Sequence, residues 1–189
     1  MIGIIKRNFK YFEKDAFINL YKAMVRSHLE YAVSVWSPRY KKDIEIIEKV
    51  QRRATKLVRG CKGKPYKDRL RYLNLPTLKY RRLRGDMLET YKILNDVYDS
   101  EAAPLLELSS ARMTRGNDKK LNKVMCKMEH RRHFFTQRVV DVWNSLPSDI
   151  INSASVNIFK NRLDKFWKNQ DIYYDYEADI AGTGNRSWL

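Results

Sequence analysis

Helical periodicity in residues 46–59 is the feature that most restricts how this chain can fold. At about 100° of rotation per residue, the apolar side chains of the segment gather on one side of a helix. They are Ile46, Ile47, Val50, Ala54, Leu57 and Val58. Five cations gather on a nearly opposite stripe, with Glu48 as the only acid of the segment. They are Lys49, Arg52, Arg53, Lys56 and Arg59. The pattern predicts a helix with one face in a core and a row of positive charge toward solvent.

A cationic row of this kind has two interpretations. Lys and Arg commonly occupy the solvated face of a helix, which is the ordinary structural explanation. The row also suits phosphate backbones, because neutralising each phosphate releases condensed counterions. The charge distribution favours phosphate: residues 1–97 carry 24 Lys and Arg against 10 Asp and Glu, whereas residues 98–189 carry 14 against 12. The five cations are therefore the first candidates for nucleic-acid contact. Flanking candidates are Lys6, Arg7 and Lys10, and Arg81, Arg82 and Arg84.

Composition indicates a globular chain. Its 189 residues suit one domain or two small subdomains, and 43% hydrophobic content is enough for a core. Cys61 and Cys126 lie far apart and form no C-x-x-C unit, which is typical of a reducing compartment. We find no secretory signal and no apolar run long enough to span a bilayer. We expect an intracellular protein, in the nucleus, the cytoplasm or both, with no membrane partner.

The first half of the chain is helical by pattern. A short helix over residues 2–12 precedes a longer one over 15–36, whose mostly apolar circumference predicts a buried central helix with His28 in the core. A further helix starts at Pro76-Thr77 and reaches about Tyr98. Cations crowd its first turns, where they oppose the helix dipole. We therefore hypothesise that an anion lies near this helix start.

The second half is less regular. Lys119–Met125 indicates one short β element, and Ser153 or Ser155 can cap a last helix. Trp36, Trp143 and Trp167 each continue an apolar stripe and are predicted to be core anchors. We predict a mostly α fold with four parts. They are a helical domain over 1–98, an irregular linker over 99–131, a helical extension over 132–168, and a mobile acidic tail over 169–189.

Little in the chain favours catalysis. Cys126, His130 and His133 have the spacing C-x3-H-x2-H, but a structural zinc site normally needs a fourth ligand. Paired carboxylates of a polymerase must converge from a rigid scaffold, which an acidic terminal segment does not provide. We find no phosphate-binding loop and no nucleophile elbow. We expect no catalytic residue, no metal, no cofactor, and no enzymatic activity of the chain by itself.

Several strings, taken in order, resemble one family. They are His28–Tyr31 with Trp36–Pro38, Ile47–Lys56, Arg81–Met87, Tyr91–Asn95, Phe134–Val140, Trp143–Pro147 and Phe159–Asp164. Together they resemble the C-terminal region of the reverse transcriptase of non-LTR (LINE-like) retrotransposons, near the jockey and chicken-repeat types. The resemblance covers about residues 2–175.

The resemblance implies a fold and a partner. It implies a thumb-like helical bundle followed by a smaller helical extension, which grips the backbone of RNA, DNA or an RNA–DNA hybrid without reading bases. The family's endonuclease and the metal-binding aspartates of its palm lie upstream of the matched region. An alternative stays open, in which the basic face docks onto the polymerase palm or another acidic protein. Oligomeric state is not predicted.

Overall fold

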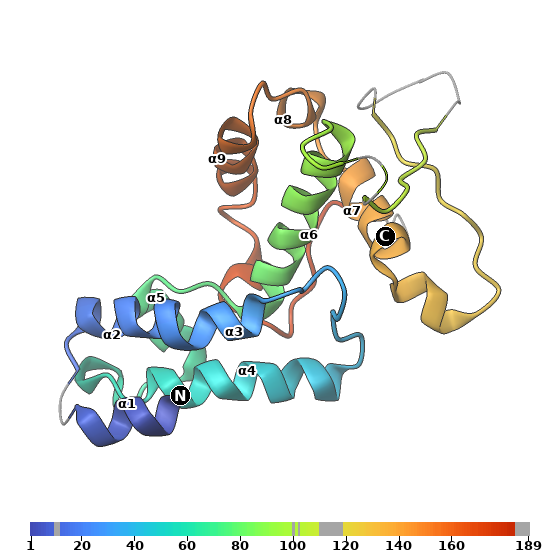
Figure 1. The fold of residues 1–189 in the computed structure, drawn as a ribbon. Coiled ribbons are helices and arrows are strands. Elements are labelled where there is room, and N and C mark those ends of the chain that lie inside the picture. The colour runs from blue at the N-terminus through green and yellow to red at the C-terminus, as the bar shows by residue number, and fades with distance from the viewer. Residues whose placement is uncertain (10–11, 100, 102, 110–118, 184–189) are drawn as a thin grey trace. The chain divides into compact units, whose positions relative to one another are not determined.

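Helices build nearly all of the regular structure in the computed structural model, which confirms the predicted mostly α fold (Figure 1). The residues that the structure describes are 1–9, 12–99, 101, 103–109 and 119–183. Within them, extended segments pair only as isolated bridges, Phe12 with Val58 and Leu108 with Leu121. The short β element expected at residues 119–125 is thus the single bridge at Leu121.

Contacts divide the chain into two units. The first unit is Met1–Arg82 together with Asp171–Asp179, and the second is Leu83–Gln170 with the described residues from Ile180 onward. This division differs from the boundaries expected near residues 98 and 168. The first boundary falls inside one long helix, α6 (Leu78–Leu94), whose early turns bond to the first unit and whose later turns pack into the core of the second.

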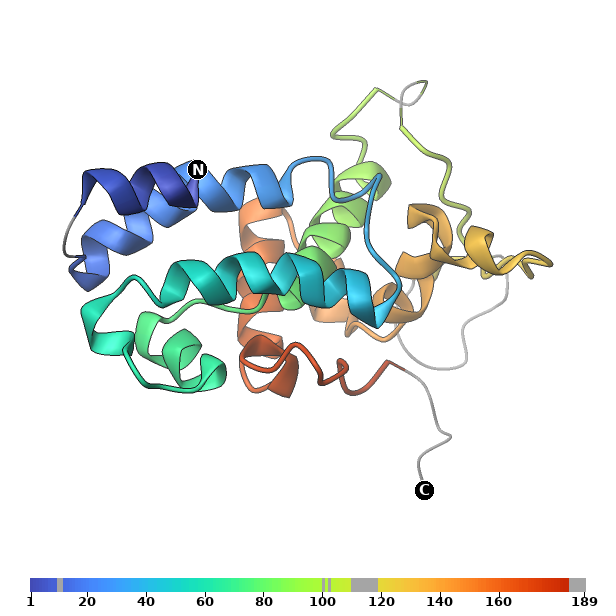
Figure 2. The same cartoon turned by 90° about the horizontal axis from the view of Figure 1, so that it is seen from below.

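The first unit contains the helices before α6 and one turn after residue 170. Its elements are α1 (Ile2–Asn8), α2 (Lys14–Leu20), η1 (Tyr21–Arg26), α3 (Ser27–Glu30), α4 (Lys41–Thr55), η2 (Arg59–Cys61), α5 (Tyr66–Leu73) and η4 (Asp171–Tyr173). The α2–α3 stretch and α4 run side by side in both views (Figures 1 and 2). Phe17, Tyr21 and Val25 lie in the core at four-residue spacing, and Leu70 and Leu73 join them from α5.

The helix expected over residues 15–36 is shorter and less buried than predicted. It runs through a π-helical segment, η1, and ends at Glu30, because Tyr31 is extended and Ala32 has a φ of 50°. His28, predicted to lie in the core, is exposed, since only one stripe of this helix is covered. Trp36, predicted to be a core anchor, is 39% exposed in the loop that follows.

The second unit packs the later turns of α6 against the C-terminal helices. Its other elements are η3 (Glu129–His133), α7 (Phe135–Asn144), α8 (Ser148–Ile151) and α9 (Val156–Phe166). Trp143 and Trp167 are buried, as predicted. The Tyr91 and Phe159 rings stack with centroids 4.4 Å apart. The hydroxyl of Ser155 accepts a hydrogen bond from the N–H of Ile158 at 3.3 Å, which confirms one of the two caps expected for the last helix.

Asn144 fixes the irregular segment before α7. Its side-chain oxygen accepts from the Leu121 N–H at 2.8 Å, and its amide nitrogen donates to the Leu121 carbonyl at 2.9 Å. The indole N–H of Trp143 donates to the Lys119 carbonyl at 2.8 Å. Two neighbouring side chains of α7 therefore satisfy backbone groups that a partner strand would otherwise satisfy.

Candidate nucleic-acid interface

The buried face of α4 is polar rather than apolar. Glu48, Gln51 and Thr55 are at most 1% exposed, beside Ala54. The predicted apolar stripe is right for Ala54 and Val58, but Ile46 is 59% exposed. The reason is that hydrogen bonds set the rotation of the helix: three polar side chains find partners only when this side faces inward.

Gln51 and Thr55 tie α4 to the elements around it. The side-chain oxygen of Gln51 accepts from the Tyr21 hydroxyl at 2.5 Å, and its amide nitrogen donates to the Pro76 carbonyl at 2.9 Å. The guanidinium of Arg69, from α5, donates to the Thr55 hydroxyl at 3.0 Å and to the Arg52 carbonyl at 2.8 Å. These bonds hold one orientation of α4 in the first unit.

Glu48 places a carboxylate at the start of α6. It accepts from the Tyr66 hydroxyl at 2.7 Å and from the Lys79 backbone N–H at 2.9 Å. Burial raises the pKa of the Glu48 carboxyl, while these hydrogen bonds and the charge of Arg82 act in the opposite direction. A negative group at a helix N-terminus is favourable for the dipole. A carboxyl group of the protein itself therefore occupies the position near this helix start where an anion was hypothesised.

The opposite face of α4 carries an exposed row of cations. Lys49, Arg53 and Lys56 are exposed, and Lys42 lies on the same face, seven residues before Lys49. We call these four residues the cationic ridge; Arg59 is exposed just after the helix. At 1.5 Å per residue, the ridge is about 21 Å long. Lys49 lies 3.4 Å from Glu45, a surface pair of small energy.

Lys42 was missed in the sequence because its segment, residues 41–45, also contains Asp43 and Glu45. The heptad spacing to Lys49 is the signal that identifies it, since residues seven apart share a face of a helix. Lys42 thus extends the predicted row by two turns toward the helix start.

Arg52, predicted to belong to the row, lies elsewhere. Its guanidinium carbon is 5.2 Å from the Tyr66 ring centroid and 5.4 Å from that of Tyr176, and it donates to the Tyr176 hydroxyl at 2.7 Å. Arg52 is half-buried. Its position on the flank of α4 assigns it to packing within the first unit.

Two of the three arginines near the start of α6 are held by carboxylates. Arg81 makes two 2.6 Å hydrogen bonds to Glu30 within the first unit. Arg84 makes bonds of 2.5 and 2.8 Å to Asp164 within the second. Arg82 is 4% exposed. Burial and ion pairing therefore account for the charge of these flanking candidates in this structure, and we place the candidate interface on α4.

The flanking candidates near the N-terminus are partly described. Lys6 and Arg7 are exposed in the last turn of α1, and Arg7 makes one 3.4 Å hydrogen bond to the Gly3 carbonyl. Lys10 lies outside the described residues. Lys6 and Arg7 keep their place as predicted flanking contacts.

The acidic segment 171–179 packs within the first unit, whereas the sequence predicted a mobile tail over residues 169–189. Thr77 donates its hydroxyl to the Ile172 carbonyl at 2.6 Å, and its N–H donates to the Tyr173 carbonyl at 2.9 Å. Lys67 lies 3.2 Å from Asp175. Burial raises the pKa of Asp175, but hydrogen bonds from the Glu177 N–H and Lys67 outweigh it, so the pKa lies below its ordinary value.

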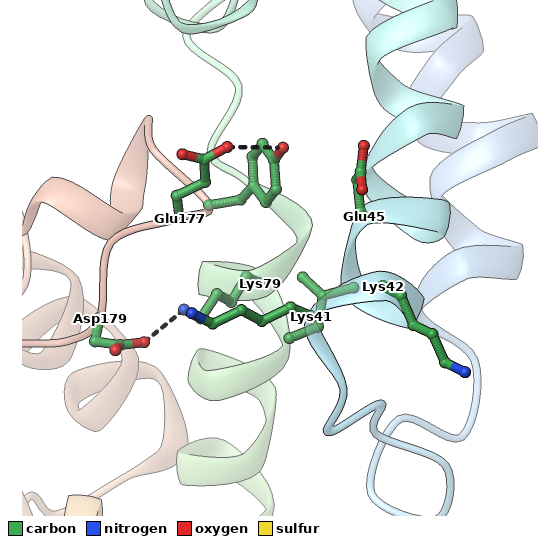
Figure 3. A pocket seen from close by; sticks show the side chains of 8 residues that line it. Lys41, Lys42, Glu45, Lys79, Glu177 and Asp179 are labelled. Carbon is green, nitrogen blue, oxygen red and sulfur yellow. Dashed lines mark hydrogen bonds and ion pairs between the residues drawn. The ribbon is translucent and has the colours of Figure 1, made fainter.

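A pocket of about 470 Å³ lies between this segment and α4 (Figure 3). Lys41, Lys42 and Lys79 line it together with three acids, Glu45, Glu177 and Asp179. Asp179 accepts from Lys79 at 2.6 Å. Because its charges are mixed, the pocket is a poor site for a polyanion, and the ridge on the outer face of α4 remains the candidate.

The described residues form neither a metal site nor a membrane-spanning helix. In that part of the chain, no three His, Cys, Asp or Glu side chains gather as a metal site would require. Cys126 is buried, whereas His130 is exposed. None of the helices placed by the structure has both the length and the apolar character needed to cross a bilayer.

Comparisons with family models, curated proteins and solved structures found no match.

Proposed function

We propose that this chain binds the sugar–phosphate backbone of RNA, DNA or an RNA–DNA hybrid through the cationic ridge and Arg59, without reading base sequence. The observation that carries the proposal is the opposition of the two faces of α4. One face is locked inward by hydrogen bonds, so the four ridge cations are held outward in a line. Pre-arranged cations lose less side-chain freedom on binding than a flexible basic tail would.

The resemblance to non-LTR retrotransposon reverse transcriptases supports a more specific assignment. Under it, the first unit acts as a thumb-like helical module of an RNA-directed DNA polymerase, and a palm supplies the catalytic metals. The chain by itself then has no polymerase activity. The ridge spans about six nucleotide steps at 3.4 Å per step along one strand, which suits a grip on backbone.

Fluorescence anisotropy across a salt series tests the proposal. If the four ridge cations and Arg59 each meet a phosphate of duplex DNA, log K should fall with log salt at a slope of about −4.5, from about 0.9 per phosphate. The triple variant K49Q/R53Q/K56Q should make the slope shallower by about 2.7. A labelled RNA–DNA hybrid, measured in parallel, gives the preference between nucleic acids.

A matched control removes the same charge elsewhere. Lys160, Lys165 and Lys168 are exposed on or just after α9, so K160Q/K165Q/K168Q changes net charge equally and should keep the slope. An equal reduction of the salt slope in both triple variants would contradict binding at the ridge, because it would indicate only general electrostatic attraction. A chain that is folded by circular dichroism but does not bind at low salt would favour the alternative, an acidic protein partner for the ridge.

A further inference from the structure

The loop between α3 and α4, residues 31–40, exposes four large apolar side chains. They are Tyr31 (78% exposed), Val35 (83%), Trp36 (39%) and Tyr40 (52%). Single exposed apolar residues are ordinary on protein surfaces, but a cluster on one loop indicates a binding surface. We call residues 31–40 the aromatic loop.

Hydrogen bonds give the aromatic loop a defined conformation. The indole N–H of Trp36 donates to the Tyr31 carbonyl at 2.5 Å. The N–H groups of Val35 and Trp36 both donate to the Ala32 carbonyl, at 2.9 and 3.3 Å. Val33 is 9% exposed and anchors the loop to the unit. The backbone of the loop and the Trp36 ring are thus held in a fixed arrangement, which lowers the ordering cost of binding.

Positive charge lies beside these rings. From Tyr31 to Lys42 the sequence contains no acid and three cations, Arg39, Lys41 and Lys42. The Arg39 guanidinium lies 4.2 Å from the Tyr40 ring centroid, and the Lys42 ammonium lies 5.8 Å from it. Lys42 is also the first residue of the cationic ridge, so the aromatic loop leads directly into the ridge.

We propose that the aromatic loop is a stacking site for unpaired nucleobases of a strand whose phosphates follow the ridge. Proteins that bind single strands combine cations along the backbone with aromatic rings under the bases, and every base offers a π face. Tyr31 and Trp36 supply the rings, while Arg39, Lys41 and Lys42 supply charge. The ligand is then a single-stranded extension next to a duplex. This inference rests on the proposed function of the ridge.

The test compares a blunt duplex with the same duplex carrying a short single-stranded overhang that contains 2-aminopurine. The wild-type chain should bind the overhang form more tightly, by about fivefold or more per stacked base, and should quench the 2-aminopurine fluorescence. The double variant Y31L/W36L keeps apolar bulk but removes both rings, so the preference and the quenching should disappear. W36F keeps a ring and should retain most of both.

Controls separate this site from the ridge. Phe166 is 48% exposed on α9, so F166L removes an exposed ring elsewhere and should change neither readout. If Y31L/W36L keeps the preference for the overhang form while K49Q/R53Q/K56Q loses affinity, the proposed stacking site is wrong and the proposed phosphate contacts of the ridge are supported. If overhang binding depends on the rings but K49Q/R53Q/K56Q leaves the salt slope unchanged, the proposal that the ridge binds phosphates is wrong instead. Equal wild-type affinity for blunt and overhang forms, or no binding to either, overturns the stacking site.

Discussion

Neighbouring arginines of α4 have different surroundings although the sequence groups them together. Arg52 lies between Tyr66 and Tyr176 and donates to the Tyr176 hydroxyl. Arg53, one residue later and about 100° further around the helix, is exposed on the ridge. We therefore expect a substitution at Arg52 to affect packing and a substitution at Arg53 to affect phosphate binding.

We expect R52Q to lower the free energy of unfolding by about 1–2 kcal/mol, because it removes a charged hydrogen bond and two ring contacts. R53Q should change it by less than about 0.5 kcal/mol, since exposed sites tolerate substitution. For nucleic-acid binding the order reverses, and R53Q should make the salt slope shallower by about 0.9. Urea unfolding and anisotropy measure the two effects. A larger stability loss in R53Q than in R52Q would contradict this assignment.

Glu48 is a buried carboxyl whose pKa is raised by burial. A group with a folded pKa above its unfolded pKa contributes stability that is complete below the unfolded pKa and is lost as pH rises through the folded pKa. E48Q lacks this titration. Stability of the wild type relative to E48Q should therefore fall as pH rises above the ordinary pKa of a glutamate and through the raised pKa of Glu48.

Chemical denaturation of the two proteins at several pH values measures this difference. E48D keeps the titrating group on a shorter side chain and should retain the pH trend. A difference between wild type and E48Q that stays constant, or that moves the other way, would show that Glu48 is not the group responsible.

At the scale of elements, the start of α6 is stabilised by contacts with a segment that is distant in sequence. Thr77 is fully buried, accepts from the Tyr80 N–H at 3.1 Å and donates to the Ile172 carbonyl at 2.6 Å. Its hydroxyl thus joins the first turn of the helix to the segment 171–179. The cap of α9 is simpler, since Ser155 is exposed and serves its own helix.

T77V should therefore lower the free energy of unfolding more than S155A does. Loss of an exposed cap typically costs about 1 kcal/mol. T77V also leaves the Ile172 carbonyl without its donor, which adds about 1–3 kcal/mol for a buried acceptor. Thermal and urea unfolding compare the two variants. Equal losses would mean that the bond to Ile172 contributes little.

At the scale of the whole molecule, positive charge is arranged rather than simply abundant. Within the first unit, Glu30 pairs with Arg81, Asp175 with Lys67 and Asp179 with Lys79. These carboxylates neutralise cations away from the ridge. A net charge of +16 alone would not predict this pairing of cations that lie off the ridge.

The sequence by itself determined the helical class, most of the row of cations on α4, and the choice of Ser153 or Ser155 as the cap of the last helix, because these depend on residues within a few turns of each other. Only the tertiary structure determined which cations remain available for contact with phosphate. Arg81 and Arg84 meet carboxylates 51 and 80 residues away, and Arg52 meets a tyrosine 124 residues away. Periodicity carries no information on such pairings, since they arise only when separate helices pack.

The same reason explains the buried polar face of α4 and the exposed Trp36. Apolar character favours burial, but the rotation of α4 follows the partners of Glu48 and Gln51, which come from α5, η1 and the segment before α6. Trp36 is exposed in a loop because the preceding helix ends at Glu30 and does not reach Trp36 as predicted. The local sequence pattern predicts which face of a helix is buried, but hydrogen bonds between distant segments determine which face is buried in the structure.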